Sequence, residues 1–395
     1  MLDLQPDKNT SVFLDGDLSH AEGRRGGEFF SRKERIDRKG WKRVRLGDVL
    51  SYEQPYQYIV KNAEYATAGT PVLTPGKTFI LGYTNETNGI YYASRTKPII
   101  LFDDFLTVSR LVDFNFKVKS SALKILSAKS DNCNLRYMFY AMSQLQFDVV
   151  DHQRHWIGQF SNLEIALPAR DQQNEIASAL DTINAHIAAL QSLIVKYEAI
   201  KKATVNLLLV PRKNWRQIRL GDIGEVSMCK RILKSQTSAT GDVPFFKIGT
   251  FGKQPDAFIS RTLFEDFKRR FSYPKVGDVL LSAAGTIGRT VVFNGENAYF
   301  QDSNIVWIAN DESIISNPFL NVVYSQINWQ TENGGTVSRL YNANIQNTIV
   351  PIPDIGAQKR IVMILDSLDD TIIGLKAQLA KSQAIKQGMM SHFFG

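Results

Sequence analysis

The chain has 395 residues, of which 44% are hydrophobic and 22% charged, so it is long enough to form two or three globular domains. Its two cysteines, Cys133 and Cys229, stand far apart in the sequence, which excludes a thiolate zinc site and a disulfide scaffold. The formal net charge of +8 favours an anionic partner such as nucleic acid, although a plain basic surface would give the same charge.

The first 40 residues form a polar segment with eight acidic and eight basic side chains. We expect this segment to be a weakly ordered extension. It has no apolar signal core, and no stretch of the chain approaches the roughly 18 apolar residues of a membrane span. These features predict a cytoplasmic protein without a membrane contact.

The chain repeats itself once, and the repeat organises the rest of the prediction. Residues 41–48, Trp-Lys-Arg-Val-Arg-Leu-Gly-Asp, return at 215–222 as Trp-Arg-Gln-Ile-Arg-Leu-Gly-Asp, an offset of 174 residues. A second pair of matching segments begins at Leu167-Pro168 and Ile352-Pro353, an offset of 185, so the second copy is 11 residues longer. Little of the sequence between these matches can be aligned. We therefore expect a duplicated scaffold that holds two divergent inserts.

Taken in chain order, each insert has the pattern of a mixed α+β domain. Short apolar or alternating runs that lie between glycine, proline, asparagine and aspartate residues predict strands. Two further segments, 135–146 and 318–330, predict short helices. The predicted strands are at 72–76, 98–102, 113–118, 278–282 and 290–293.

Each copy ends in a long helical pattern, in which apolar residues are spaced alternately four and three apart. This heptad spacing is typical of helices that pair with each other, and each helix would run for about 35 residues before a break such as Pro211. The alternative is that each seam is only the buried face of a helix in an ordinary domain. The predicted seam residues are Ile176, Leu180, Ile183, Ile187 and Leu190 in the first helix, and Ile361, Leu365, Leu368, Ile372 and Leu375 in the second.

The sequence contains no catalytic constellation. Residues 285–290 lack the lysine and the spacing of a Walker A loop, and residues 317–320 match the Asn-Pro-Pro-aromatic tetrapeptide of amino methyltransferases only in part. Asp103 and Asp104 could bind Mg²⁺, but nothing nearby completes a metal site. The sequence therefore predicts a binding protein that has no catalytic residue and no metal site.

Basic side chains combine with aromatic rings or amides at several places. Residues 152–156 and 338–342 occupy matching positions, because Trp156 and Tyr341 are again 185 residues apart. Arginine on guanine and asparagine on adenine are common contacts in a major groove, and other basic residues would contact phosphates. The alternative for each of them is a solvated surface charge. The predicted DNA-binding residues are Lys77, Arg154, His155, Trp156, Lys230, Arg231, Lys247, Arg289, Arg339, Tyr341 and Asn342.

Together these residues resemble a known family, the specificity subunits of type I restriction–modification enzymes. The similar features are Trp-x-x-x-Arg-Leu-Gly-Asp at the start of each copy, residues 277–288, the proline with a glutamine three to five residues on, and the helices with Ile-x-x-x-Leu-Asp. Residues 386–394 are similar to the last helical turn of that family. The likeness covers residues 41–395.

The resemblance implies an α+β fold with a pseudo-two-fold internal repeat, in which two mixed target-recognition domains are separated by two long helices that form an antiparallel coiled coil. Each domain would read one half of an interrupted double-stranded DNA target. The implied organisation is an extension at 1–40, domains at 41–168 and 211–353, and spacer helices at 169–210 and 354–395.

The resemblance also implies the partners. Two modification subunits would dock on the helices and methylate adenine with S-adenosylmethionine, and restriction subunits would supply ATP-driven translocation and Mg²⁺-dependent cleavage. This chain would hold no cofactor. Two other interpretations stay open: a self-contained DNA methyltransferase or nuclease with unrecognised motifs, and a coiled-coil adaptor that does not bind DNA.

Overall fold

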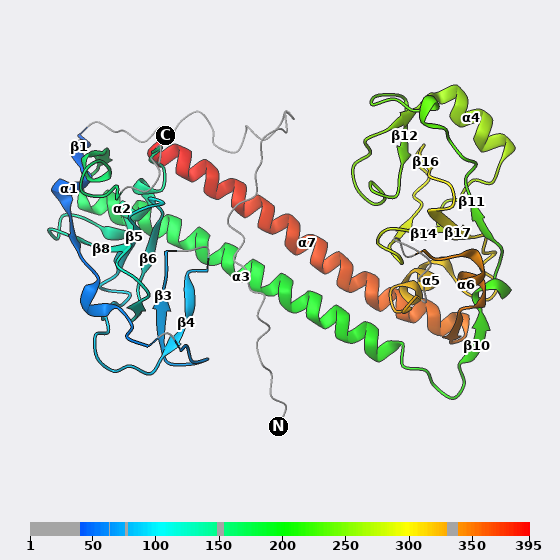
Figure 1. Cartoon of the computed structure of the whole chain (residues 1–395), viewed down its shortest axis with the longest axis horizontal. Coiled ribbons are helices and arrows are strands. Elements are labelled where there is room, and N and C mark those ends of the chain that lie inside the picture. The colour runs from blue at the N-terminus through cyan, green and yellow to red at the C-terminus, as the bar shows by residue number, and fades with distance from the viewer. Residues whose placement is uncertain (1–39, 63, 76–77, 148–153, 330–338) are drawn as a thin grey trace. The chain divides into compact units, whose positions relative to one another are not determined.

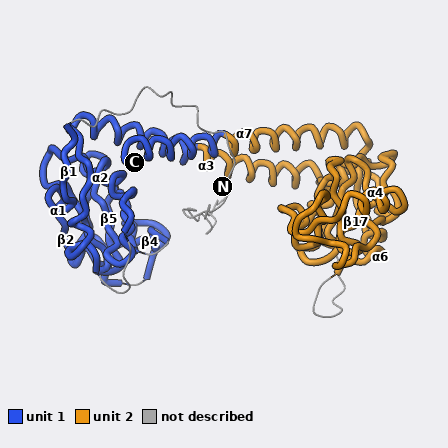
Figure 2. The backbone as a smooth tube through the Cα atoms, turned by 90° about the horizontal axis from the view of Figure 1, so that it is seen from above, with its two compact units in different colours: residues 1–189, 378–395 blue, residues 190–377 orange. Residues whose placement is uncertain are grey.

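The structure, a computed structural model, describes residues 40–62, 64–75, 78–147, 154–329 and 339–395. The chain divides into two compact units, which Figure 2 shows in blue and orange. Unit 1 combines the described residues up to Ala189 with Gln378–Gly395, and unit 2 is Leu190–Ala377. Each long helix therefore contributes one part to each unit.

Unit 1 is built on three sheets, whose strands are β1 (Lys42–Arg45), β2 (Leu50–Glu53), β3 (Thr70–Leu73), β4 (Ile80–Thr84), β5 (Ile99–Asp103), β6 (Ser109–Val112), β7 (Lys117–Val118), β8 (Leu123–Ala128) and β9 (Glu164–Leu167). The largest sheet is antiparallel and has the order β2-β8-β5-β6. A second sheet has the order β4-β3-β7, and β1 pairs with β9 where the chain enters and leaves the domain.

The central strand β5 separates two hydrophobic cores, which explains why its first four residues, Ile99–Phe102, are all apolar. Ile100 and Phe102 face the core that contains the helix α2 (Leu135–Met142). Ile99 and Leu101 face the opposite core, against the sheet β4-β3-β7. All five residues of β5 are buried, and this burial fixes the register of the sheet.

Unit 2 repeats this topology strand for strand. Its strands are β10 (Arg216–Arg219), β11 (Val226–Met228), β12 (Val243–Phe246), β13 (Phe258–Ile259), β14 (Val279–Ser282), β15 (Thr290–Val292), β16 (Tyr299–Phe300), β17 (Ile305–Ile308) and β18 (Ile349–Ile352). Their orders are β11-β17-β14-β15, β13-β12-β16 and β10-β18. The predicted repeat is confirmed. It also includes the inserts, whose strands have the same order in both units although their sequences differ.

The predicted short helices are present but end earlier than the sequence pattern indicated. They are α2 in unit 1 and α5 (Asn317–Tyr324) in unit 2. Unit 2 also has α4 (Arg261–Arg270), which lies between β13 and β14 and has no counterpart among the described residues of unit 1. The remaining helical segments are α1 (Leu46–Val49) and α6 (Asn342–Asn347), with 3₁₀ turns at Tyr56–Tyr58, Phe160–Asn162, Leu220–Asp222 and Lys234–Gln236.

The two long helices, α3 (Arg170–Leu208) and α7 (Ile355–Phe394), pair antiparallel (Figure 1). In unit 2, Lys201 pairs with Asp369 at 2.5 Å and Lys376 pairs with Glu198 at 2.8 Å, so the numbers rise on one helix as they fall on the other. In unit 1, Met390 near the end of α7 packs into the core that holds the first turns of α3. The predicted coiled coil is confirmed.

The predicted seam residues are buried or half-buried along both helices. The domain boundaries at the helix ends stay a prediction, because the two compact units divide both helices near the middle. Within the described residues, we find no helical segment with both the length and the hydropathy needed to cross a bilayer.

Candidate nucleic-acid interface

Of the two predicted DNA-binding segments, the structure describes residues 154–156 and 339–342, here called the first and second recognition loops; residues 152, 153 and 338 lie outside the described residues. The two loops occupy equivalent points of the two units. In unit 1, the backbone N–H of His155 donates to the carbonyl of Asp104, 2.9 Å away, directly after β5. In unit 2, the N–H of Leu340 donates to the carbonyl of Ala283, also 2.9 Å away, directly after β14. Since β5 and β14 are the same strand of the repeat, Arg154 and Arg339 occupy matching positions.

The first loop exposes one of its predicted side chains and buries two. Arg154 is exposed, whereas Trp156 and His155 are each only 1% exposed. The ring of Trp156 packs 5.1 Å from that of Phe102, and the ring of His155 packs 5.2 Å from that of Phe147. This burial leaves neither ring a surface for a base, so the functional proposal for this loop depends on Arg154.

The second loop has a different distribution of exposure. Arg339 is half-buried, and its guanidinium donates to the carbonyl of Ser303 at 3.0 Å. Tyr341 is 47% exposed, and Asn342 is exposed at the start of α6. Among the described residues of this loop, Tyr341 and Asn342 are the exposed side chains, while Arg339 also holds the loop to its own domain.

The other predicted basic residues of unit 2 have varied surroundings. Lys230 and Arg231 are exposed, and the Lys230 ammonium lies 5.2 Å from the centre of the Phe271 ring. Lys247 forms a 2.8 Å ion pair with Asp256, and Arg289 donates to the carbonyl of Phe251 at 3.0 Å. Lys77 lies outside the described residues. Arg231 also pairs with Asp302 at 3.7 Å, but its side chain is 74% exposed, against 42% for Lys247. Lys230 and Arg231 are therefore the more available of these residues for a phosphate contact.

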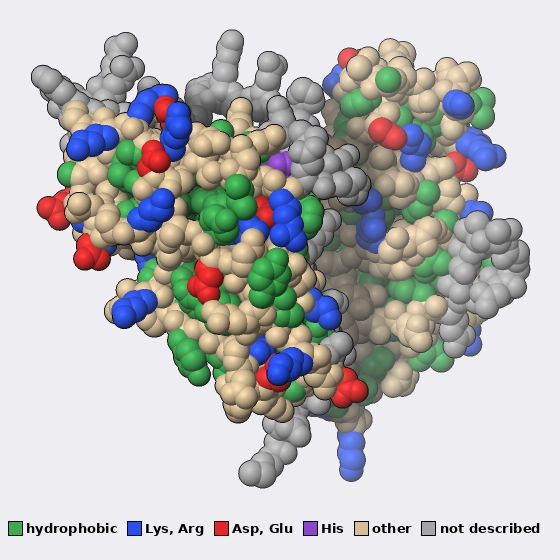
Figure 3. All heavy atoms as spheres, turned by 60° about the vertical axis from the view of Figure 1, so that its left-hand side comes forward, with side chains coloured by type: hydrophobic (Ala, Val, Ile, Leu, Met, Phe, Trp, Pro, Cys, Tyr) green, Lys and Arg blue, Asp and Glu red, His purple; other side chains and the backbone are tan. Residues whose placement is uncertain are grey.

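The charge on the face of unit 1 is dispersed. Figure 3 shows lysine and arginine side chains spread over this face among apolar patches and a few acidic groups. The described part of the chain contains no group of three or more histidine, cysteine, aspartate or glutamate side chains that could hold a metal ion.

A buried glutamine joins each recognition domain to a long helix, a role that the sequence did not predict. In unit 1, the amide nitrogen of Gln173 donates to the carbonyls of Pro168 at 2.8 Å and Asn132 at 3.1 Å. Its amide oxygen accepts from the N–H of Asn134, which caps α2, at 2.8 Å. One side chain thus holds the start of α3 against the start of α2.

Unit 2 repeats this junction with different neighbours. Gln358 donates to the carbonyls of Ile314 at 3.0 Å and Pro353 at 3.1 Å, and it accepts from the N–H of Ser316 at 2.9 Å. Gln358 is 0% exposed and Gln173 is 1% exposed. A Pro-x₄-Gln spacing that recurs at the repeat offset is the signal that could have indicated this role.

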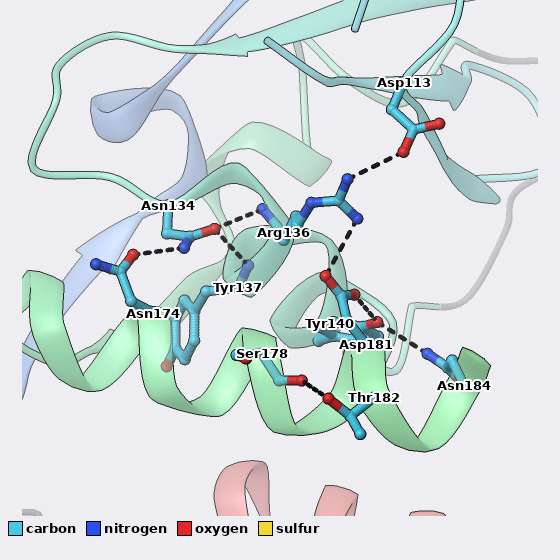
Figure 4. Close-up of polar contacts among 10 residues, drawn as sticks. All are labelled: Asp113, Asn134, Arg136, Tyr137, Tyr140, Asn174, Ser178, Asp181, Thr182 and Asn184. Carbon is cyan, nitrogen blue, oxygen red and sulfur yellow. Dashed lines mark hydrogen bonds and ion pairs between the residues drawn. The ribbon is translucent and has the colours of Figure 1, made fainter. Parts of the chain in front are cut away.

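Unit 1 has a second, charged junction, which Figure 4 shows. Arg136 on α2 pairs with Asp113 at 3.0 Å and with Asp181 on α3 at 3.2 Å. Asp181 also accepts from the Tyr140 hydroxyl, which in turn accepts from Asn184 at 2.8 Å. Burial, and then the hydrogen bond to Asp181, raises the pKa of Tyr140.

Two copies of one mixed domain, each held on a pair of antiparallel helices and each presenting a matching loop with exposed polar side chains, define a two-domain recognition protein. The family model named Type I restriction modification DNA specificity domain matches the chain twice, at residues 38–197 and 212–387. The chain belongs to this family, as the DNA specificity subunit, the non-catalytic component, of a type I restriction–modification complex.

Three individual proteins that are similar to this chain are named as specificity or S subunits. A Haemophilus influenzae protein named as a type I restriction enzyme specificity subunit is 42% identical over 252 residues, which are 60% of this chain and 65% of that protein. The specificity subunit of a type I restriction enzyme from Escherichia coli is 30% identical over 376 residues, 88% of this chain and 91% of that protein. The crystal structure of the S subunit from M. genitalium shares the fold, with a TM-score of 0.63 at 15% identity over 90% of this chain and 96% of that one.

Proposed function

We propose that each unit reads one half of a two-part, interrupted DNA target, and that the helix pair sets the gap between the halves. The observation behind this proposal is the matching position of the Arg154 and Arg339 loops on sheets of identical strand order. Different side chains at matching positions would let the two domains read different bases, and so give an asymmetric target. Two readers on one chain also gain affinity from effective concentration.

We propose that Arg154 reads a base in the first half-site, and that Tyr341 and Asn342 contact the second. Arg154 is exposed next to an anchored backbone, and asparagine and arginine are the side chains that pair bidentately with adenine and guanine. Lys230 and Arg231 would contact phosphates, which position a reader without supplying sequence information. His155 and Trp156 support the loop from the core side.

The proposed partners are two modification subunits, which dock on the long helices and methylate adenine with S-adenosylmethionine, and restriction subunits, which use ATP and Mg²⁺. Within unit 2, both long helices expose apolar side chains, and we assign these side chains to the surface on which the modification subunits dock. The most exposed are Val195, Leu207, Met363 and Ile373, at 64%, 72%, 66% and 65%. In this proposal the cofactors bind the partners, and the complex works in the cytoplasm.

DNA methylation by the reconstituted complex tests this function. We expect methyl transfer to adenine when this chain and its modification subunit are combined, and none from either alone. The affinity of the complex for DNA should fall steeply with salt, with a slope of log K against log salt of roughly −5 for six phosphate contacts. DNA binding without salt dependence, or turnover by this chain alone, would contradict the proposal and favour an adaptor or a self-contained enzyme.

A further inference from the structure

The strongest unexplained feature of unit 1 is a buried ion pair next to the Arg154 loop. Lys124 Nζ lies 3.0 Å from Asp104 Oδ2, and the two side chains are 0% and 1% exposed. Among the described residues, Lys124 Nζ has no hydrogen bond in addition to this ion pair, and it lies 5.7 Å from the centre of the Tyr52 ring. Since removing both charges from water costs more than such a pair commonly returns, stability alone is a poor reason for it.

The ion pair holds the backbone that follows Arg154. Asp104 Oδ1 accepts from the N–H of Trp156 at 2.9 Å, while the Asp104 carbonyl accepts from the N–H of His155 at 2.9 Å. One residue thus holds two successive amides of the loop, and Lys124 holds its carboxylate in place. A carboxylate that accepts from a buried N–H makes a stronger bond than a neutral acceptor, so the direction of the loop is closely defined.

Unit 2 shows what the same fold does without the charges. The register of β5 on β8 sets Phe102 opposite Lys124, and the register of β14 on β17 sets Leu281 opposite Val306. Val306 therefore stands where unit 1 has Lys124, and Ala283, which accepts from the Leu340 N–H, stands where unit 1 has Asp104.

The amide that corresponds to Trp156 N–H has a local partner in unit 2. The N–H of Tyr341 donates to Asn344 Oδ1 at 3.2 Å, within the first turn of α6. Unit 1 has a 3₁₀ turn at this point, Phe160–Asn162, and its Trp156 amide instead depends on Asp104, which lies after a different strand. The carboxylate therefore has a positioning role in unit 1 that unit 2 does not need.

We propose that Asp104 and Lys124 are positioning residues, which hold the Arg154 loop in the orientation that reads the first half-site and have no effect on the second. This inference rests on the proposed function, since it assumes that Arg154 reads a base. Arg154, which would contact the base, is exposed, whereas Asp104 and Lys124, which would hold its loop, are buried.

The internal repeat suggests which residues should replace the ion pair, because unit 2 has uncharged residues at the same two positions. Asp104→Ala with Lys124→Val installs the two residues that unit 2 has at these positions, so no uncompensated charge is left in the core. Asp104→Ala alone leaves a buried ammonium without its partner, and this variant should be destabilised. Comparing the double variant with the single one separates a role in stability from a role in positioning.

The test uses the complex of this chain with its modification subunit, and duplexes that differ from the target by one base in either half. We expect the double variant to unfold above the midpoint of Asp104→Ala but below that of the wild type, because the buried Trp156 N–H loses its acceptor. Its discrimination between the target and a duplex with one changed base in the first half should fall at least tenfold. Its discrimination in the second half should equal that of the wild type. Arg154→Ala, measured in parallel, should show the same loss restricted to the first half.

The possible results separate the inference from the function on which it rests. Wild-type discrimination by the double variant, together with a loss in Arg154→Ala, would overturn the positioning role and leave the proposed function intact. Equal losses in both halves would also overturn it, because the pair would then act on the whole complex. If Arg154→Ala discriminates between bases in the first half as well as the wild type does, Arg154 does not read a base, and the proposed site is wrong.

Discussion

At the scale of single residues, the two recognition loops differ in what their matching side chains do. Trp156 is buried in the core of unit 1, whereas Tyr341 at the same repeat position is about half exposed. The sequence could predict that both loops lie beside the closing strand of their domain, because the spacing repeats. It could not predict that Trp156 faces inward, because an aromatic residue beside basic ones occurs both in binding surfaces and under them.

Because of this difference, replacement by alanine should affect stability at Trp156 and DNA binding at Tyr341. Trp156→Ala should lower the free energy of unfolding by about 3–5 kcal/mol, because it removes a fully buried ring from a packed core. Tyr341→Ala should change it by less than about 1 kcal/mol and instead weaken binding to the second half-site. Denaturant unfolding of both variants checks the first effect. Similar stability losses would show that the two loops are equally buried in solution.

The burial of the two cysteines predicts that the free energy of unfolding falls at alkaline pH. Burial raises the pKa of the Cys133 thiol to about 11 and that of Cys229 to about 12, from a usual value of 9.0. Because the unfolded thiols lose their protons first, the stabilisation is complete below about pH 8.5 and is lost as the pH rises toward the folded values. Unfolding measured from pH 8 to 11 should show this decline, and Cys133→Ala should reduce it. A stability that is constant over this range would contradict the burial of both thiols.

At the scale of elements, the long helices were the most predictable part of the fold, and their junctions were the least. A heptad seam is visible in the sequence, because helical packing depends on residues three and four apart. The junctions depend on Gln173 and Gln358, whose partners are backbone carbonyls and amides of segments about 40 residues away. Backbone partners leave no mark in the sequence, so only the repeated spacing could indicate them.

Removal of either glutamine should loosen its own junction. Gln173→Ala leaves the Asn134 N–H and two carbonyls without their partner in a buried place, which should cost about 2 kcal/mol of unfolding free energy. Gln358→Ala should cost a similar amount in unit 2. The neighbouring Gln172 is exposed, so Gln172→Ala is the matched control and should change stability by less than about 0.5 kcal/mol. Equal effects at 172 and 173 would contradict the role of the buried amide.

The exposed apolar side chains of α7 predict a separate effect on assembly. Ile373→Glu places a charge on the surface proposed for the modification subunit, and should weaken co-purification of the two chains at least tenfold. The fold should be unaffected, since Ile373 is 65% exposed. Gln378→Glu adds the same charge at another exposed position of this helix and serves as the control. Undiminished assembly of the Ile373 variant would place the partner elsewhere.

At the scale of the whole molecule, the duplication accounts for the way the chain is organised. The repeated segments at 41–48 and 215–222 predicted two domains, and the structure gives both the same three sheets. The sequence could not predict that the inserts share their strand order, because buried strands accept any apolar residue of suitable size. Divergent side chains on a shared scaffold are consistent with our proposal that the two domains read different half-sites.

The most direct test is a genome-wide map of methylated adenines in cells that contain the modification subunit with this chain, with its Arg154→Ala variant, or without it. We predict a motif that depends on this chain and consists of two parts with a fixed gap. In the Arg154→Ala cells, one part should become degenerate or methylation should disappear. A single continuous motif, or adenine methylation that does not depend on this chain while the modification subunit is active, would contradict the account.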